Sequence, residues 1–242
     1  MTESTPRSKP AAADMPARYY EPWRDWFDTQ VAMRLRAGTT ILDIGGGRCP
    51  SVPLSQRPTG TTYIGLDPDA KELTAAPAGS YDQTFVSRAE QRIPDLVDSV
   101  DLAISWQVFE HVASLESVLQ NVHSYLVPGG VLVSLFSGRW SAFAVINRLL
   151  PFSVGIPLVS RIARRDPEVD PVFPACYDMC YHTVLKRLMS NWSQVEIVPL
   201  YRGASYFGFS RPLMRGYLLY ENAIRFAKWN NGATHYLLVA TR

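Results

Sequence analysis

The chain has 242 residues, of which 47% are hydrophobic and 19% charged, and its formal net charge is only +2. This composition fills the core of one domain of α/β size, which excludes a disordered or fibrous protein. The near balance of charge also gives no general indication of a polyanion-binding protein.

Short apolar runs alternate with amphipathic stretches in the first half of the chain. Residues 1–17 are polar and rich in Pro and Ala, so we expect a disordered leader there. Apolar residues at spacings of three and four predict a helix over Tyr19–Leu35. Strands are predicted at Thr39–Ile44, Thr61–Leu66, Tyr81–Val86, Val100–Ser105 and Val131–Phe136, with a helix over Val108–Leu126 that ends at Pro128-Gly129-Gly130.

The regular alternation of predicted strands and helices ends after Ser137. We predict helices at Thr183–Met189 and Pro212–Trp229 and strands at Gln194–Tyr201 and Thr234–Ala240. Strands that alternate with helices indicate βαβ crossovers, so the fold class is α/β with a doubly wound, mostly parallel sheet. Residues 18–242 form one domain in this interpretation, and segments 138–180 and 208–230 are cap elements over a binding site.

Charge and apolar runs are unevenly distributed. Residues 1–137 carry 11 basic and 16 acidic residues, a net charge of −5, whereas residues 138–242 carry 13 and 6, a net charge of +7. Polar residues and prolines interrupt the longest apolar stretch, Ala142–Ser160, so we expect no transmembrane helix. Five arginines surround it, which indicates either an interfacial lid for an anionic or lipid-linked ligand or a cap with a solvated basic face: Arg139, Arg148, Arg161, Arg164 and Arg165.

Three scattered cysteines imply no disulfide framework and predict a reducing compartment, hence a cytoplasmic protein, with membrane association left open. Cys176 and Cys180 are half of a zinc ligand set at most, and no second CxxC or HxxxH pair accompanies them. We therefore predict no metal site.

The most informative segment is Ile41-Leu42-Asp43-Ile44-Gly45-Gly46-Gly47-Arg48, in which a strand runs directly into three glycines. Glycine allows a sharp turn and a close approach of ligand to backbone. Asp67 ends the next strand 24 residues after Asp43, where an acid accepts hydrogen bonds from ribose hydroxyls. A nicotinamide fingerprint needs a third glycine where Pro50 stands, and a pyrophosphate would be repelled by Asp43, whereas a cofactor with a cationic amino-acid end would be attracted.

Six elements in order resemble the class I S-adenosylmethionine-dependent methyltransferases, a family that includes ubiquinone-biosynthesis and natural-product O-methyltransferases. They span about residues 40–137 and read LDIGGG at 42–47, IGLD at 64–67, Ala89-Glu90, DLAIS at 101–105, VFEHV at 108–112 and LVPGG at 126–130. The glycine motif departs from GxGxG, because Cys49 stands at its third glycine.

The resemblance implies S-adenosylmethionine as cofactor and a Rossmann-like, seven-stranded sheet with an antiparallel last strand. It implies that Asp43, Gly45, Gly46 and Gly47 hold the methionine end and Asp67 and Pro68 the ribose. Three further groups follow from it: Ala89 and Glu90 would border the adenine, Ser105, Trp106 and Gln107 would line the methyl-transfer site, and Tyr20 or Tyr19 would cover the cofactor.

Histidines are the natural general bases for a hydroxyl nucleophile. His111 is the first candidate because it follows the fourth strand, and His182 is a weaker second one; each has the alternative of a purely structural role. The Asn/Asp-Pro-Pro-aromatic tetrad of amine-modifying enzymes is absent, since Ser105-Trp106-Gln107-Val108 stands there, which argues against nucleic acid as acceptor. We expect O-methylation of a small-molecule, saccharide or lipid-linked acceptor, with a nicotinamide oxidoreductase and a non-catalytic cofactor-binding protein as alternatives.

Overall fold

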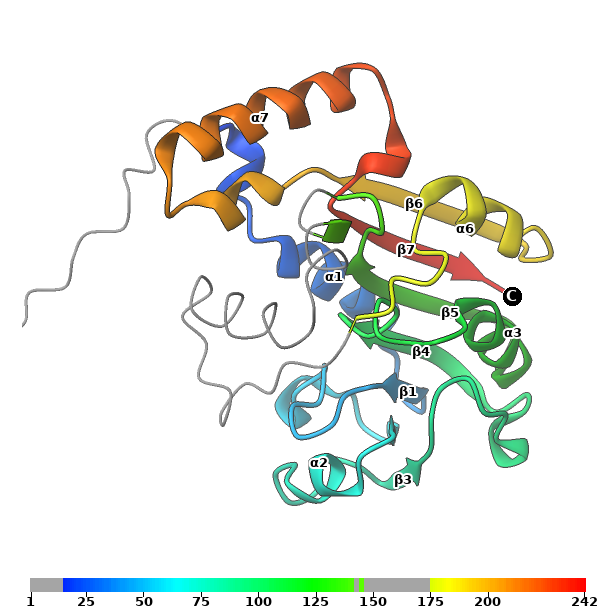
Figure 1. The fold of residues 1–242 in the computed structure, drawn as a ribbon. Helices are drawn as coiled ribbons and strands as arrows, with labels where there is room; N and C mark the ends of the chain where they lie inside the picture. Colours follow the sequence, from blue (N-terminus) through cyan, green and yellow to red (C-terminus); the bar gives the residue numbers. More distant parts are fainter. Residues whose placement is uncertain (1–14, 142–143, 146–174) are drawn as a thin grey trace, which may run out of the picture.

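The computed structural model describes residues 15–141, 144–145 and 175–242. Within them the strands form one seven-stranded sheet with the order β3-β2-β1-β4-β5-β7-β6 (Figure 1). The strands are β1 Thr40–Ile44, β2 Thr62–Asp67, β3 Gln83–Val86, β4 Val100–Trp106, β5 Leu126–Ser137, β6 Gln194–Leu200 and β7 His235–Thr241. Strands β1 to β5 pair in parallel, and β7 pairs antiparallel with both β5 and β6. The predicted fold class and the antiparallel last strand are confirmed.

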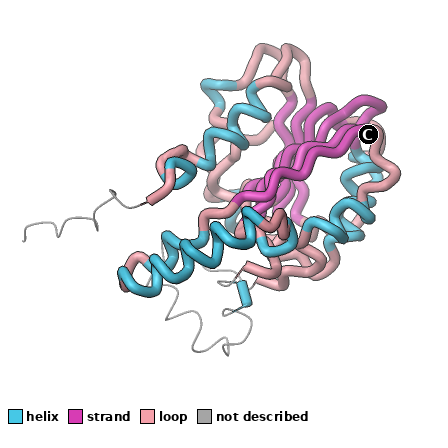
Figure 2. The backbone as a smooth tube through the Cα atoms, turned by 90° about the horizontal axis from the view of Figure 1, so that it is seen from above, coloured by secondary structure: helices cyan, strands magenta, loops and turns pink. Residues whose placement is uncertain are grey.

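Helices cover both faces of the sheet (Figure 2). Helix α1 (Trp23–Ala32) buries Phe27 and Val31 on one face, and α3 (Leu115–Tyr125) buries Val118 and Val122 on the other. The remaining helices are α2 (Ala70–Thr74), α6 (His182–Leu188) and α7 (Arg211–Phe226). Two separate apolar clusters result, as expected for a sheet covered on both sides.

Successive side chains of a strand point to opposite faces of the sheet, and each cluster takes the side chains of one face. Leu42 and Ile44 of β1 face the α3 side, whereas Ile41 and Asp43 face the α1 side. The carboxyl ends of the parallel strands meet at one edge, where a doubly wound sheet binds its ligand. The Gly45–Gly47 turn lies at that edge directly after β1.

Two predicted boundaries are wrong. The helix expected from Val108 begins only at Leu115, where the Ser114 side chain caps it by accepting a hydrogen bond from Ser117 N at 3.3 Å. Strand β5 begins at Leu126 rather than Val131, because Pro128-Gly129-Gly130 is absorbed into it: the β4–β5 register shifts there and Gly129 adopts φ +82°.

Several predictions fall outside the described residues. They include most of the leader and four of the five arginines around the longest apolar stretch, namely Arg148, Arg161, Arg164 and Arg165. Among the described helices, none is long and apolar enough to cross a membrane.

Candidate active site

The turn after β1 is built so tightly that side chains are excluded from it. Gly45 and Gly47 adopt φ angles of +75° and +48°, and Gly45 N donates a 2.7 Å hydrogen bond to the carbonyl of Leu66 on β2. A Cβ on Gly45 would overlap Val108 Cγ2, and one on Gly46 would lie 2.5 Å from Asp43 Oδ2. Backbone therefore forms the surface of this turn, which is the cradle that a close-lying cofactor needs.

Asp43 lies fully buried directly behind the turn. Its Oδ2 accepts hydrogen bonds from Ser51 N and Tyr63 OH, both at 2.7 Å, and its Oδ1 accepts one from Ser51 Oγ at 2.9 Å. Burial raises the pKa of the Asp43 carboxyl, and these three donors oppose that rise. Asp43 thus places a buried acidic group beside the turn and also fixes the turn to the segment around Ser51.

Asp67 ends β2 beside the same turn. Its Oδ1 accepts from Asp69 N at 2.9 Å, while a Cβ on Gly47 would lie 3.2 Å from its Oδ2. Partial burial raises the pKa of the Asp67 carboxyl, and the nearby carboxylates of Glu72, Asp69 and Asp43 add to that rise. Donors from a ligand, such as two ribose hydroxyls, would relieve this crowding of negative charge.

A pocket of about 240 Å³ opens next to this turn. Five of the predicted residues line it, namely Gly45, Pro68, Ala89, Glu90 and His111. The other lining residues, which were not predicted as site residues, are Ile44, Leu66, Ser87, Arg88, Val108 and Val112. The volume lies below the roughly 300–1,000 Å³ typical of sites for drug-sized ligands, so the pocket accommodates one part of a nucleoside cofactor rather than all of it.

The wall of the pocket that Ala89 and Glu90 form is held by α3 and the residues just before it. Asn121 Nδ2 donates to the Ala89 carbonyl at 3.0 Å, and Glu90 Oε1 accepts from Ala113 N at 2.8 Å. The segment after β3 is therefore held to Ala113, just before α3, and to Asn121 within that helix. These contacts fix Ala89 and Glu90, the two residues that the resemblance assigns to the adenine.

The three residues predicted after β4 do not act as one group. Ser105 is fully buried on the α3 side of the sheet, and Trp106 packs on the opposite face against Trp23 and Phe27, with ring centroids at 5.1 and 5.2 Å. Gln107 alone turns at the carboxyl edge, with φ +57°. Strand alternation separates their side chains, so of the three only Gln107 presents its side chain at that edge.

Ser137, at the end of β5, organises two polar side chains at this edge. Its Oγ lies 3.3 Å from Gln107 Oε1, and its N donates to Glu110 Oε1 at 3.1 Å. The second polar atom of each side chain, Gln107 Nε2 and Glu110 Oε2, is buried and has no hydrogen-bond partner among the described residues. Burial raises the pKa of the Glu110 carboxyl. Buried polar atoms without a partner, such as Gln107 Nε2 and Glu110 Oε2, require an explanation, and a bound ligand would supply one.

His235 begins β7 opposite Ser137 in the β5–β7 register and is 3% exposed. Its ring lies 4.6 Å from that of Trp23, and its Nδ1 is buried without a hydrogen-bond partner. Burial, with a contribution from Arg202, lowers the pKa of His235 to about 3, so the imidazole is neutral. Glu110 lies within the VFEHV element but was given no role of its own, and His235 was interpreted as a structural residue. Their separate links to Ser137, by a hydrogen bond and by the β5–β7 register, cannot be read from local spacing.

The remaining predicted residues lie elsewhere. His182 starts α6 and is not among the pocket residues; burial lowers its pKa. Tyr20 is 53% exposed and also lies outside the pocket lining. Tyr19 hydrogen-bonds to Glu221 of α7 and accepts from Ala204 N at 2.9 Å, so its hydroxyl is committed to the protein.

No cluster of metal-ligating side chains occurs among residues 15–141, 144–145 and 175–242. Cys180 is buried, and Cys176, four residues away, is exposed. Burial raises the pKa of the Cys180 thiol, which disfavours the thiolate that a metal requires.

Comparison with known proteins places these features in a family. A family model for methyltransferase domains matches residues 15–151. An uncharacterized methyltransferase of Mycolicibacterium vanbaalenii is 38% identical over 101 residues, which are 40% of this chain and 39% of that protein. The mitochondrial ubiquinone biosynthesis O-methyltransferase of Bos taurus is 33% identical over 142 residues, which are 54% of this chain and 35% of the bovine protein. The matches thus span well under two thirds of these relatives.

Solved structures share the fold at low sequence identity. Phosphoethanolamine N-methyltransferase 2 of Haemonchus contortus, in complex with S-adenosyl-L-methionine, has a TM-score of 0.56 at 12% identity, covering 91% of this chain and 52% of that one. An S-adenosylmethionine-dependent methyltransferase from Mesorhizobium loti has a TM-score of 0.54 at 19% identity, and the match covers 90% of this chain and 98% of that one.

Proposed function

The chain belongs to the class I S-adenosylmethionine-dependent methyltransferases, and on this premise we propose that it methylates a hydroxyl oxygen of a small-molecule, saccharide or lipid-linked acceptor. The observation that carries the proposal is the backbone cradle at Gly45–Gly47, with Asp67 on one side and the 240 Å³ pocket on the other. The nicotinamide alternative is wrong, because the family match identifies a methyltransferase domain.

The described residues fit the cofactor. The glycine turn leaves no room for Cβ atoms where a ligand would lie against the backbone. Asp67 has an oxygen available for ribose hydroxyls, and Pro68, Ala89 and Glu90 surround a space for a flat base. When bound, S-adenosylmethionine supplies a methyl group already activated by its sulfonium.

The acceptor site is best placed at the carboxyl edge of β4 and β5. Gln107 and Glu110 each have one polar atom fixed by Ser137 and a second one buried without a partner. A hydroxylated acceptor would satisfy both atoms, since Nε2 donates and a carboxylate accepts. Orientation of the nucleophile and exclusion of water then account for much of the rate.

We assign the proton transfer to His111 within this proposal. It lies next to Glu110 and lines the pocket, so it is the only one of the two histidine candidates found at the cofactor side. An imidazole near neutral pH suits the removal of a hydroxyl proton as the O–CH3 bond forms. Support for oxygen as the target comes from the bovine relative, whose name states O-methylation.

The first experiment is calorimetric titration of S-adenosylmethionine and S-adenosylhomocysteine into the wild type and Asp67→Ala, with NAD as control. Micromolar binding that is lost in the variant is the expected result. Failure of a folded protein to bind either compound would contradict the proposed function.

The second experiment measures transfer of a labelled methyl group to matched phenol, saccharide, amine and thiol acceptors. Labelling of a hydroxyl compound that falls at least a hundredfold in His111→Gln, with cofactor affinity unchanged, supports the proposal. Labelling of amines instead would contradict O-methylation. Cofactor binding without transfer to any acceptor would favour the non-catalytic alternative.

A further inference from the structure

Helix α7 turns an apolar stripe away from the protein. Only Tyr217, Glu221 and Ile224 of this 16-residue helix are buried. Phe226 is 93% exposed and Leu219 is 72% exposed, and their spacing of seven residues places them on one side of the helix. Leu213, 54% exposed, lies six residues before Leu219 and therefore on a different side of α7.

Aromatic side chains continue this surface at both ends of the helix. Phe209, just before α7, is 63% exposed, and Trp229, just after it, is 45% exposed. Single exposed apolar residues need no explanation, but several large ones within the segment 209–229 indicate an interaction site. We call these five residues the α7 surface: Phe209, Leu213, Leu219, Phe226 and Trp229.

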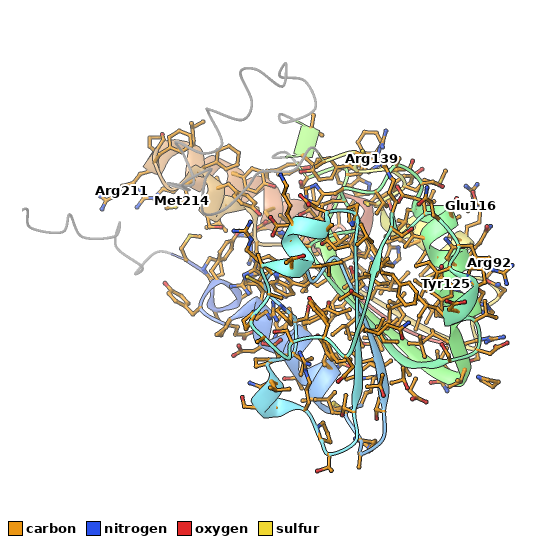
Figure 3. All side chains as sticks on the ribbon, turned by 90° about the horizontal axis from the view of Figure 1, so that it is seen from below. Arg92, Glu116, Tyr125, Arg139, Arg211 and Met214 are labelled. Atoms are coloured by element: carbon orange, nitrogen blue, oxygen red, sulfur yellow. The ribbon has the colours of Figure 1, made fainter. Side chains whose placement is uncertain are left out.

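The exposed charged side chains of segment 208–232 are all positive. Arg211, Arg225 and Lys228 are exposed, and Figure 3 shows Arg211 and Met214 at the outer end of the helix. The sole acidic residue of segment 208–232 is Glu221, which is 1% exposed. A second copy that docked through the same face would bring like charges together, so an anionic partner fits this face better than a symmetric dimer does.

Glu221 fixes the orientation of α7. Its carboxylate accepts from Arg18 at 3.0 Å, from Gly203 N at 2.6 Å and from Thr234 Oγ1 at 3.2 Å. The helix is thereby attached on the side that carries Tyr217, Glu221 and Ile224, and Leu219 and Phe226 are exposed. Because Glu221, the one acidic residue of segment 208–232, is buried and paired, the exposed charges of this segment are all positive.

We propose that the α7 surface binds an anionic lipid bilayer, with the helix lying in the plane of the membrane interface. Leu219 and Phe226 would enter the boundary between headgroups and acyl chains, where aliphatic and aromatic side chains lose their water contact. Arg211, Arg225 and Lys228 would pair with lipid phosphates. A nucleic acid would engage the cations but offer no apolar layer to a Leu/Phe stripe, so the bilayer is the better partner.

The test is co-sedimentation of the full chain with two kinds of vesicle. One consists of phosphatidylcholine alone, and the other also contains about 30% phosphatidylglycerol, which gives it a clearly anionic surface. We expect binding to the anionic vesicles that weakens as salt rises, because exposed charges are screened. Leu219→Ser/Phe226→Ser should reduce partitioning at least tenfold. Arg211→Gln/Arg225→Gln/Lys228→Gln should remove the preference for anionic over neutral vesicles.

The matched control is Leu54→Ser/Val86→Ser, which changes two side chains exposed to similar extents, 62% and 58%, elsewhere on the molecule. This variant should bind vesicles like the wild type. Equal binding by the Leu219/Phe226 variant, or no vesicle binding by the wild type, would overturn the proposal. Dimerisation in sedimentation velocity, or tight binding of RNA, lost in the Leu219/Phe226 variant would assign the surface to those partners instead.

Discussion

Gly45 and Val108 lie so close across the edge of the sheet that a single methyl group does not fit between them. A Cβ on Gly45 would overlap Cγ2 of Val108 and lie 3.0 Å from its Cγ1. Gly45 also has φ +75°, a conformation that L side chains rarely adopt. Two independent reasons therefore require glycine here, and both concern the cofactor cradle.

Gly45→Ala should weaken S-adenosylhomocysteine binding at least tenfold, because Val108 or the turn must move. Gly38→Ala is the matched control: its φ is +76°, yet nothing lies within 4 Å of its Cβ position. The control carries the backbone strain of about 1–2 kcal/mol without the clash. Titration calorimetry should show normal affinity for Gly38→Ala and partial recovery in Gly45→Ala/Val108→Ala. Equal affinities for the two single variants would remove the role given to Val108.

Cofactor affinity should depend on pH through Asp67. The pKa of its carboxyl is raised by burial and by neighbouring carboxylates, and ribose hydroxyls bind the ionised form. The pKa of Asp67 in the free protein lies above the ordinary value of about 3.9, so binding weakens as the pH falls toward it. A protonated Asp67 must lose its proton when the cofactor binds. The dissociation constant of S-adenosylhomocysteine should rise from pH 7 to pH 5 in the wild type.

Asp67→Asn separates this effect from a general response of the fold to acid. It should bind more weakly at pH 7 and show a flat profile over the same range. A profile in Asp67→Asn as steep as that of the wild type would show that another group controls the pH dependence.

Two tyrosines near the turn should contribute unequally to stability. Tyr63 OH donates to buried Asp43 at 2.7 Å and accepts from Val52 N at 3.0 Å, whereas Tyr81 OH donates only to the Gly47 carbonyl at 2.9 Å. Tyr63→Phe leaves a buried carboxylate and a buried N–H short of a partner, which costs about 1–3 kcal/mol. Tyr81→Phe should cost about 0.5–1.5 kcal/mol. Urea unfolding of both variants measures the difference, and a larger loss in Tyr81→Phe would contradict this order.

Periodicity and the glycine motif predicted most of the fold. The strands β1 to β4 and helix α7 appear within a few residues of their predicted bounds, because turn signals flank the strands and the apolar spacing of the helix is helical. The segment 108–114 was predicted to be helical because Val108 and Val112 have helical spacing, yet both line the pocket. An apolar residue that faces a ligand gives the same pattern as one that faces a core.

The site was predictable where a motif is local and not where the sheet assembles it. Gly45, Pro68, Ala89, Glu90 and His111 follow strand ends, and parallel strands bring those ends together. By contrast, Ser137 and His235 meet through the antiparallel β5–β7 register, which no local spacing reveals. A weak signal existed for Tyr81: Gly65 interrupts β2, and its missing side chain makes room for that ring.

His235 should make the protein sensitive to acid. Its pKa is lowered to about 3 in the folded state by burial and by Arg202, against about 6.5 when unfolded. The unfolded chain therefore binds a proton that the folded chain rejects, so stability is lost as pH falls from 6.5 toward 3. At pH 4.5 the loss from this residue amounts to roughly 2–3 kcal/mol.

His235→Phe keeps a ring beside Trp23 but has no titrating group. Its free energy of unfolding in urea should therefore fall less than that of the wild type between pH 7 and pH 4.5. His182→Gln serves as the comparison: His182 is only half-buried and its pKa is lowered less, so this variant should depart from the wild type less than His235→Phe does. Parallel pH profiles for the wild type and His235→Phe would show that His235 is protonated in the folded protein, contrary to its fully buried position between Trp23 and Arg202.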